Sequence, residues 1–265
     1  MIALNYIESF FRQSILSFKA LFGWLDPKIY LLIKVINPVF QLLFFVLLAK
    51  YVYNAEDVTP WVIGNAFLLC TSNAIFGVGN VLANERNFGT LKIVVASPAN
   101  KFLVFVGRAF MHIFDAMITV MIGLLTGMLV FGVSFSGVNI PLFILTIMVS
   151  MFAASGLGLL IGSLGLRIRD MNLVMNTAAM GLLALSGANF PISQLPAFLG
   201  IVSYGIPLTR SIQAARLIVD NGNSQLIYKL ISQEFIIGII YILAGYLLLR
   251  IMELNARKTA TLDIY

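Results

Sequence analysis

Three ionisable residues, Arg108, His112 and Asp115, stand at helical spacing inside an otherwise apolar run. Spacings of four and three residues place them on one face of a helix predicted over residues 102–131. Histidine titrates near neutral pH, so this trio has the chemistry of a proton relay. Arg108 lies only about two turns into the helix, from where its side chain can reach the membrane surface. That position favours a structural charge network, and both interpretations stay open.

Further polar residues form stripes on two other apolar segments, predicted as helices over 30–53 and 172–188. Polar and charged side chains inside a membrane segment usually face protein or water, where hydrogen bonds satisfy them. Each stripe is therefore expected to face a neighbouring helix or an aqueous path. The residues are Lys34, Asn37 and Gln41 on the first segment, Asn172 and Asn176 on the second, and Asn189 just beyond it.

The residue types needed for catalysis are scarce in this chain. Residues 156–163 are glycine-rich but lack the lysine of a phosphate-binding loop, so we expect no ATP hydrolysis by this chain alone. Ala154, Gly158 and Gly162 recur every fourth residue, which favours close helix packing instead. His112 is the only histidine and Cys70 the only cysteine, so no nucleophile set, disulfide framework or thiolate metal site is expected. We predict no enzyme activity, no metal and no bound cofactor.

Composition indicates an integral membrane protein. Of 265 residues, 60% are hydrophobic and 11% charged, with a mean hydropathy of +0.97. Soluble domains have about 25% charged residues. The net charge of +6 comes from lysines and arginines gathered at the ends of apolar runs, so a nucleic-acid partner is not expected and a lipid bilayer is.

Apolar runs predict six membrane-spanning helices in one transmembrane domain over residues 1–265. Residues 171–209 are uncharged over a length that one span cannot use, and prolines interrupt them. Residues 191–219 are therefore predicted to form a re-entrant hairpin on the extracellular side, before the last helix. The predicted spans are 30–53, 61–83, 102–131, 140–166, 172–188 and 230–251.

The amino-terminal segment predicts an amphipathic helix over residues 1–23 that lies in the membrane interface. At helical spacing the apolar residues fall on one face and the polar residues on the other, whereas a signal peptide has a continuous apolar core. Glu8 and Arg12 on its polar face have the spacing of an ion pair. With this segment inside, 13 lysines and arginines fall on the cytoplasmic side and 4 outside. Both termini are thus predicted to be cytoplasmic.

Residues 84–98 are the distinctive polar segment between the second and third predicted spans. Asn84 or Asn87 can cap a short helix, and Glu85 fits its first turn. Ser97-Pro98 then turns the chain. We expect a small cytoplasmic amphipathic element that contacts a partner protein.

Two stretches resemble a known family. The pattern Glu85-Arg86-x-x-Gly89-Thr90-Leu91, followed by Ser97-Pro98, resembles the coupling-helix segment of the membrane subunit of ABC exporters of the type-2 permease family. The stretch 186–196, with Pro207-Leu208-Thr209 and Ala214-Ala215-Arg216 after it, is similar to the same family.

The resemblance implies a permease that works as a homo- or heterodimer with two separate ATPase subunits, which bind the ATP and Mg²⁺. Glu85 and Arg86 would make polar contacts with an ATPase, Phe88 and Leu91 would fill an apolar cleft on it, and Gly89 and Thr90 would complete the coupling segment. The first and fifth spans of two permeases would border the translocation path, so the polar stripes would line it. Hydrogen bonding between helices is the alternative for those residues.

Multidrug-type members of the family suggest a drug, antibiotic or lipid-like cargo, exported across a prokaryotic inner membrane. Polysaccharide or lipid-linked glycan export is the rival within the family. A proton-coupled secondary transporter that uses Arg108, His112 and Asp115 is the alternative from another class. A membrane scaffold without transport is a third.

Overall fold

The computed structural model describes residues 8, 10–12, 14–16, 19, 26–80, 101–165, 168 and 170–259. Within these residues every regular element is a helix, which confirms the predicted all-α class. The longer helices are α2 (Pro27–Tyr53), α3 (Thr59–Leu68), α6 (Lys101–Phe131), α7 (Ile140–Leu164), α8 (Met171–Leu185) and α11 (Ser224–Thr259). The shorter ones are η1 (Ser72–Gly77), η2 (Ile192–Gln194), α9 (Ala197–Gly205) and α10 (Thr209–Val219).

Local sequence explains where several helices begin. The side chains of Asp26, Asn139 and Asp170 accept backbone N–H groups in the first turns of α2, α7 and α8. These bonds satisfy donors that have no partner inside a helix. Proline occupies the first or second position of α2, α3 and α7, where its missing N–H is no loss.

Five helices in the described part are long and apolar enough to cross a membrane. They are Lys28–Tyr53, Thr59–Asn80, Phe102–Phe131, Ile140–Leu164 and Ser224–Asn255. Helix α8 has 15 residues, a length of about 22 Å at 1.5 Å per residue, against an apolar bilayer core of about 30 Å. The predicted fifth span is therefore a shorter apolar helix, and five spans rather than six meet the length requirement.

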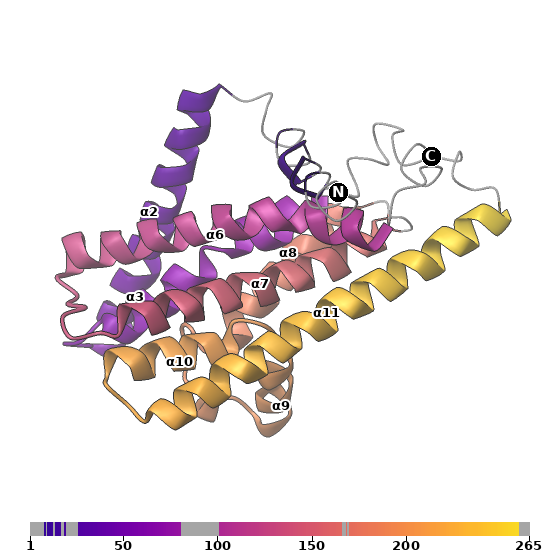
Figure 1. Cartoon of the computed structure of the whole chain (residues 1–265). Coiled ribbons are helices and arrows are strands. Elements are labelled where there is room, and N and C mark those ends of the chain that lie inside the picture. Colours follow the sequence, from indigo (N-terminus) through magenta and orange to yellow (C-terminus); the bar gives the residue numbers. More distant parts are fainter. Residues whose placement is uncertain are drawn as a thin grey trace.

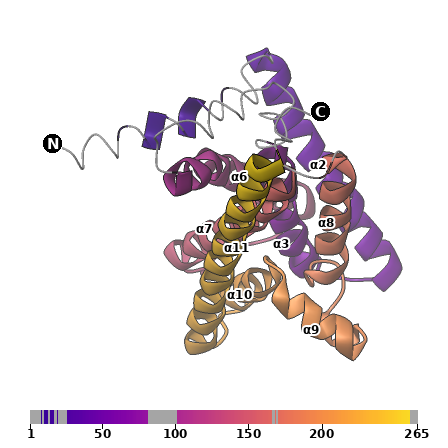
Figure 2. The ribbon, with the colours of Figure 1, turned by 90° about the vertical axis from the view of Figure 1, so that its right-hand side faces the viewer.

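Helix α3 and its continuation through η1 lie at the centre of the bundle. Of the 18-residue apolar stretch in this span 88% is buried, whereas in α2 and α11 the buried share of such a stretch is 17%. Helices α6 and α7 pack on this central segment, and α11 runs along α7 (Figures 1 and 2). Because α2 and α11 lie outside the core, their exposed faces are available to lipid or to another protein.

Glycines allow the closest helix contacts. A Cβ on Gly158 of α7 would overlap the Ala74 carbonyl oxygen of η1, and one on Gly162 would lie 3.1 Å from the Gly79 carbonyl oxygen. Ala154, one turn earlier, is fully buried. The stripe of small residues thus lies against the central segment, where backbones approach each other directly.

The segment between α8 and α11 folds into η2, α9 and α10, which lie together at one side of the bundle (Figure 1). Gly187 and Leu208 both have a φ of +77°, the first just after α8 and the second directly before α10. The positive φ suits glycine at the first position but strains leucine at the second. Residues 191–219 thus form three short helices, and the re-entrant hairpin on the extracellular side stays a prediction.

Described residues of the predicted amino-terminal helix are helical and pack on α6. The rings of Phe10 and Phe11 meet the Phe110 ring edge-to-face at centroid distances of 5.3 and 5.4 Å. Arg12 pairs with Glu8 at 2.7 Å, as their spacing predicted. Aromatic contacts therefore tie this segment to the first half of α6.

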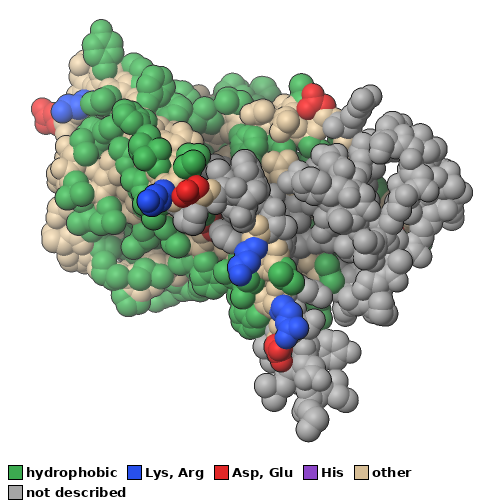
Figure 3. Space-filling model, turned by 90° about the horizontal axis from the view of Figure 1, so that it is seen from above, with side chains coloured by type: hydrophobic (Ala, Val, Ile, Leu, Met, Phe, Trp, Pro, Cys, Tyr) green, Lys and Arg blue, Asp and Glu red, His purple; other side chains and the backbone are tan. Residues whose placement is uncertain are grey.

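The surface is predominantly apolar. Figure 3 shows hydrophobic side chains over most of the described part of one face, with few charged groups among them. On α2 the apolar residues Phe40, Phe44 and Leu47 are each more than half exposed. Such an exposed apolar face is typical of a helix that contacts lipid or another protein.

Candidate functional site

An ion pair joins α2 to α6 inside the bundle. Lys34 Nζ lies 2.5 Å from Asp115 Oδ2, with side chains only 11% and 8% exposed. The Tyr30 hydroxyl donates to Asp115 Oδ1 at 2.7 Å, and Lys34 Nζ also donates to the Asp115 carbonyl oxygen at 2.9 Å. A charge in this position needs a partner, since an unpaired ion in the membrane is costly.

The π-helical turn η1 brings a third element into this group. In the amide orientation that satisfies both of its polar atoms, Asn73 donates to Asp115 Oδ2 at 3.0 Å. Its oxygen accepts from Thr119 at 2.7 Å and from Lys34 at 3.1 Å. A π-turn inserts an extra residue into a helix, and such turns are frequent at functional sites. We call Tyr30, Lys34, Asn73, Asp115 and Thr119 the polar cluster.

The predicted trio on α6 is therefore divided. Asp115 belongs to the polar cluster, where its ionic partner is Lys34 of another helix rather than a residue of its own helix. His112 is fully buried against η1, and a Cβ on Gly77 would lie 2.9 Å from its Nδ1. The side chain of Arg108 lies outside the described residues.

Arg216 of α10 is a second polar centre. Its guanidinium donates to the carbonyl oxygens of Pro60, at 2.8 and 3.0 Å, and of Gly187 and Ala188, both at 2.9 Å. Burial lowers the pKa of Arg216 to about 10, still well above neutral pH, and Asp220 opposes the shift. The charged fork therefore fastens the segment after α8 to the start of α3.

Glu234 of α11 binds the backbone directly before α10. Its side chain is fully buried, and Oε1 accepts the backbone N–H of Leu208 at 2.6 Å, directly before α10. A carboxylate at a helix amino terminus is stabilised by the unpaired N–H groups there. The bond also fixes Leu208 in its strained conformation.

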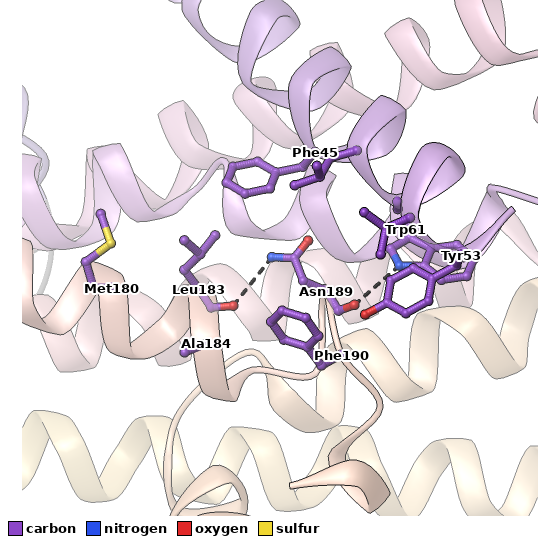
Figure 4. Close-up of a pocket in the computed structure, with 11 residues that line it drawn as sticks. Phe45, Tyr53, Trp61, Met180, Leu183, Ala184, Asn189 and Phe190 are labelled. Atoms are coloured by element: carbon purple, nitrogen blue, oxygen red, sulfur yellow. Dashed lines mark hydrogen bonds between the residues drawn. The ribbon is translucent and has the colours of Figure 1, made fainter. Parts of the chain in front are cut away.

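An apolar cavity of about 400 Å³ lies between α2, the start of α3 and the end of α8. Figure 4 shows Phe45 and Tyr53 reaching it from α2, Trp61 from α3, and Leu183, Asn189 and Phe190 from α8 and the residues after it. The full lining is Phe45, Leu48, Ala49, Val52, Tyr53, Trp61, Met180, Leu183, Ala184, Asn189 and Phe190.

Polar atoms around this cavity are bonded within the protein. Asn189 Oδ1 accepts from Asn65 at 3.0 Å, and its backbone oxygen accepts from Trp61 Nε1 at 3.3 Å. Asn189 Nδ2 donates to the Leu183 carbonyl oxygen at 3.4 Å. These bonds lock the α8 end to the α3 start beneath the cavity (Figure 4).

The residues predicted to line a path do not gather in one place. Lys34 lies in the polar cluster and Asn189 at the cavity, whereas Asn37 is exposed on α2 and Gln41 is half-buried. Asn172 and Asn176 are exposed on α8, where Asn176 Nδ2 donates to the Asn172 carbonyl oxygen at 2.8 Å. The α8 stripe thus points away from the rest of this chain.

The predicted coupling residues Glu85, Arg86, Phe88, Gly89, Thr90 and Leu91 lie outside the described residues. The helices that flank them are described. The continuation of α3 ends and α6 begins at the end of the bundle where α11 also ends (Figure 1).

Sequence reasoning singled out Lys34 and Asp115 but did not bring them together, and it missed Tyr30 and Thr119. Tyr30 lies one turn before Lys34, so its helical spacing was a readable signal. Asn73 is displaced by the π-turn, and a regular 3.6-residue period cannot place such a residue. Arg216 belongs to a stretch that resembles the family, but its partners depend on how residues 186–223 fold.

Comparison with known proteins decides the family. Residues 14–219, most of the chain, match the ABC-2 type transporter family. The chain belongs to that family. It is also 26% identical over 155 residues to proteins described as inner membrane transport permease YhhJ in Escherichia coli K12 and in Shigella flexneri. That match covers 57% of this chain and 41% of each relative, so the chain spans about two fifths of the length of these relatives.

This family membership confirms the resemblance noted in the sequence. As an ABC-2 chain with several helices long and apolar enough to cross a bilayer, the protein is an integral membrane protein.

Proposed function

We propose that the chain is the permease subunit of an ATP-driven exporter, which works as a pair with two separate ATPase subunits in a prokaryotic inner membrane. The observation that carries this proposal is the family match over residues 14–219, which includes the segment between α3 and α6. The ATPases bind the ATP and Mg²⁺. Both chain termini and residues 84–98 lie on the cytoplasmic side.

Residues 84–98 transmit the work of ATP binding and hydrolysis to the bundle. Glu85 and Arg86 bond to the ATPase, while Phe88 and Leu91 enter its apolar cleft. Movement of this segment reaches α3 first because α3 and η1 lead directly into it. The polar cluster then connects η1 to α2 and α6, so a push on the segment also shifts the first span.

The translocation path lies between two copies of this chain or of related permeases, bordered by α2 and α8. The exposed Asn37, Asn172 and Asn176 support this arrangement because polar side chains are costly against lipid. Helix α8 acts as the sixth span together with the residues after it, and residues 191–219 dip into the outer leaflet.

The cargo is a hydrophobic or amphipathic molecule such as a drug, an antibiotic or a lipid. Apolar side chains predominate over polar ones on the exposed face of α2, and a path with such a wall favours an amphipathic cargo. Glycan-type cargo is the alternative, and aromatic and polar side chains lining the assembled path would favour it.

Coupling can be tested in the complex reconstituted into vesicles with its ATPase. Glu85→Ala and Gly89→Val should leave the chain folded and assembled but separate ATP hydrolysis from transport of an amphipathic dye. Normal coupled transport in both variants contradicts the assignment. A secondary transporter, favoured by the buried Lys34–Asp115 pair, would instead move the dye without the ATPase when a pH gradient is applied.

A further inference from the structure

Among the described residues that line the cavity between α2 and α8, the polar side-chain groups are the Asn189 amide, the Trp61 indole N–H and the Tyr53 hydroxyl. Asn189 supplies the one amide among the eleven described lining residues, and both ends of that amide are bonded within the protein. Trp61 likewise donates its indole N–H to the Asn189 backbone. Water needs two to four polar partners to occupy such a space, so hydrocarbon suits the cavity better than water.

The shape of the lining fits a linear chain. Phe45, Leu48, Ala49, Val52 and Tyr53 form one stripe along α2. From Phe45 to Tyr53 the helix rises about 12 Å over eight steps of about 1.5 Å, so the lining side chains follow α2 lengthwise. The opposite wall is the last turns of α8. A volume of about 400 Å³ falls in the lower part of the range of about 300–1,000 Å³ for ligand sites.

An aromatic pair marks one end of the cavity. The Tyr53 and Trp61 rings stack at 5.7 Å between centroids, at the junction of α2 and α3. Beyond them, the connection between these helices carries Glu56 and Asp57, both exposed. Tyrosine and tryptophan gather where a bilayer meets water, so this end lies at the level of lipid headgroups.

We propose that this cavity binds one acyl chain of a bilayer phospholipid, with its headgroup at the Tyr53–Trp61 end and its tail along Phe45. The binding is a property of this chain alone and does not depend on the proposed transport. Its selectivity comes from close packing rather than from the hydrophobic effect, because the chain leaves one apolar environment for another. A bound acyl chain fills the space between α2 and α8 and links these two helices.

The test uses the full chain in phosphatidylcholine vesicles that contain a small share of phosphatidylcholine with a photoreactive diazirine in one acyl chain. After illumination, mass spectrometry locates the adducts. We expect adducts at Leu48 and Met180 to be about tenfold denser than at Leu47 and Leu247. These two control residues do not line the cavity, yet are 53% and 61% exposed, close to the 46% and 62% of Leu48 and Met180.

Filling the cavity provides the matched comparison. Leu48→Trp and Ala184→Phe should each lower cavity labelling about tenfold, while Leu47→Trp on the same helix leaves it unchanged. Size-exclusion chromatography and circular dichroism verify that each variant folds. Two filling variants are used so that the test still stands if one of them does not fold. Equal labelling of all exposed apolar residues would mean that lipid contacts only the surface of the protein, and it would overturn the proposal. So would cavity labelling that survives both filling variants.

Discussion

Asp115 accepts contacts from side chains on two other helical segments. Lys34 and Tyr30 approach from α2, and Asn73 approaches from η1. Replacing one partner of such a group leaves the others buried without compensation, and this cost usually exceeds the net worth of the original pair. The spacing of charges on α6 alone pointed to Arg108 and His112, whereas the decisive partner came from a segment 81 residues away in the sequence.

Asp115→Ala should therefore destabilise the chain by about 3–5 kcal/mol, because it leaves the Lys34 ammonium buried without its counter-ion. The double variant Lys34→Met/Asp115→Leu removes both charges and should recover most of that loss. Thermal unfolding in detergent measures both. A double variant no more stable than Asp115→Ala would show that the pair itself supplies the stability.

Arg216 provides a second prediction for a single residue. Arg216→Ala leaves the carbonyl oxygens of Pro60, Gly187 and Ala188 without this donor, so hydrogen exchange across residues 186–208 should accelerate. Arg216→Lys keeps the charge but not the fork, and should give an intermediate rate. The exposed Lys229→Ala serves as the control. Unchanged exchange in Arg216→Ala would contradict the role of this residue as a fastener.

For the helices, the sequence predictions agree best with the structure where the length and hydropathy of an apolar run are enough to define a membrane span. The spans predicted over 30–53, 102–131 and 140–166 differ from α2, α6 and α7 by only a few residues at either end. The pattern fails at η1, because a π-turn follows from tertiary contacts rather than from local composition. It also overestimates α8, which ends at Leu185 before the positive φ of Gly187.

Helix packing yields a matched pair of substitutions. Gly158→Ala places a methyl group on the Ala74 carbonyl oxygen and should cost about 1–3 kcal/mol through overpacking. Gly181→Ala on α8 meets nothing within 4 Å and should be neutral or stabilising by up to about 1 kcal/mol. Thermal unfolding of the two purified variants gives the comparison. Equal losses would mean that helix propensity, rather than close approach, governs both positions.

At the scale of the whole molecule, a single copy leaves α2 and α8 with polar and apolar groups facing outward. The exposed Asn172 and Asn176 have hydrogen-bonding capacity that lipid cannot satisfy. A second permease that covers this face satisfies it. Their spacing of four residues predicts that these asparagines share one helical face. Only the folded chain shows that this face points outward.

Asn176→Trp should therefore weaken self-association of the purified chain, because a bulky ring disrupts a close contact at α8. The same substitution at Leu247 of α11, a residue 61% exposed on another face, should leave it unchanged. Mass measurement of the detergent-solubilised complex by light scattering tests both. Equal effects at the two positions would place the subunit contact elsewhere.

The candidate site was predictable in part. The motif around residues 85–91 indicated the family, and family membership is now shown. The polar cluster and the apolar cavity were not predictable, because each joins residues from three segments that only the folded bundle brings together. Chemistry that resides on one segment can be read from sequence, whereas chemistry shared between segments needs the fold.

The central claim is that an ATPase acts on this chain through residues 84–98 on the cytoplasmic side. Cys70 is the only cysteine, so Cys70→Ala gives a background in which Thr90→Cys is a unique probe. In the assembled complex, a thiol cross-linker should join Thr90→Cys to the ATPase, and a membrane-impermeant maleimide should label it only after intact cells are opened. Labelling from outside intact cells, or no cross-link to the ATPase, would contradict the account.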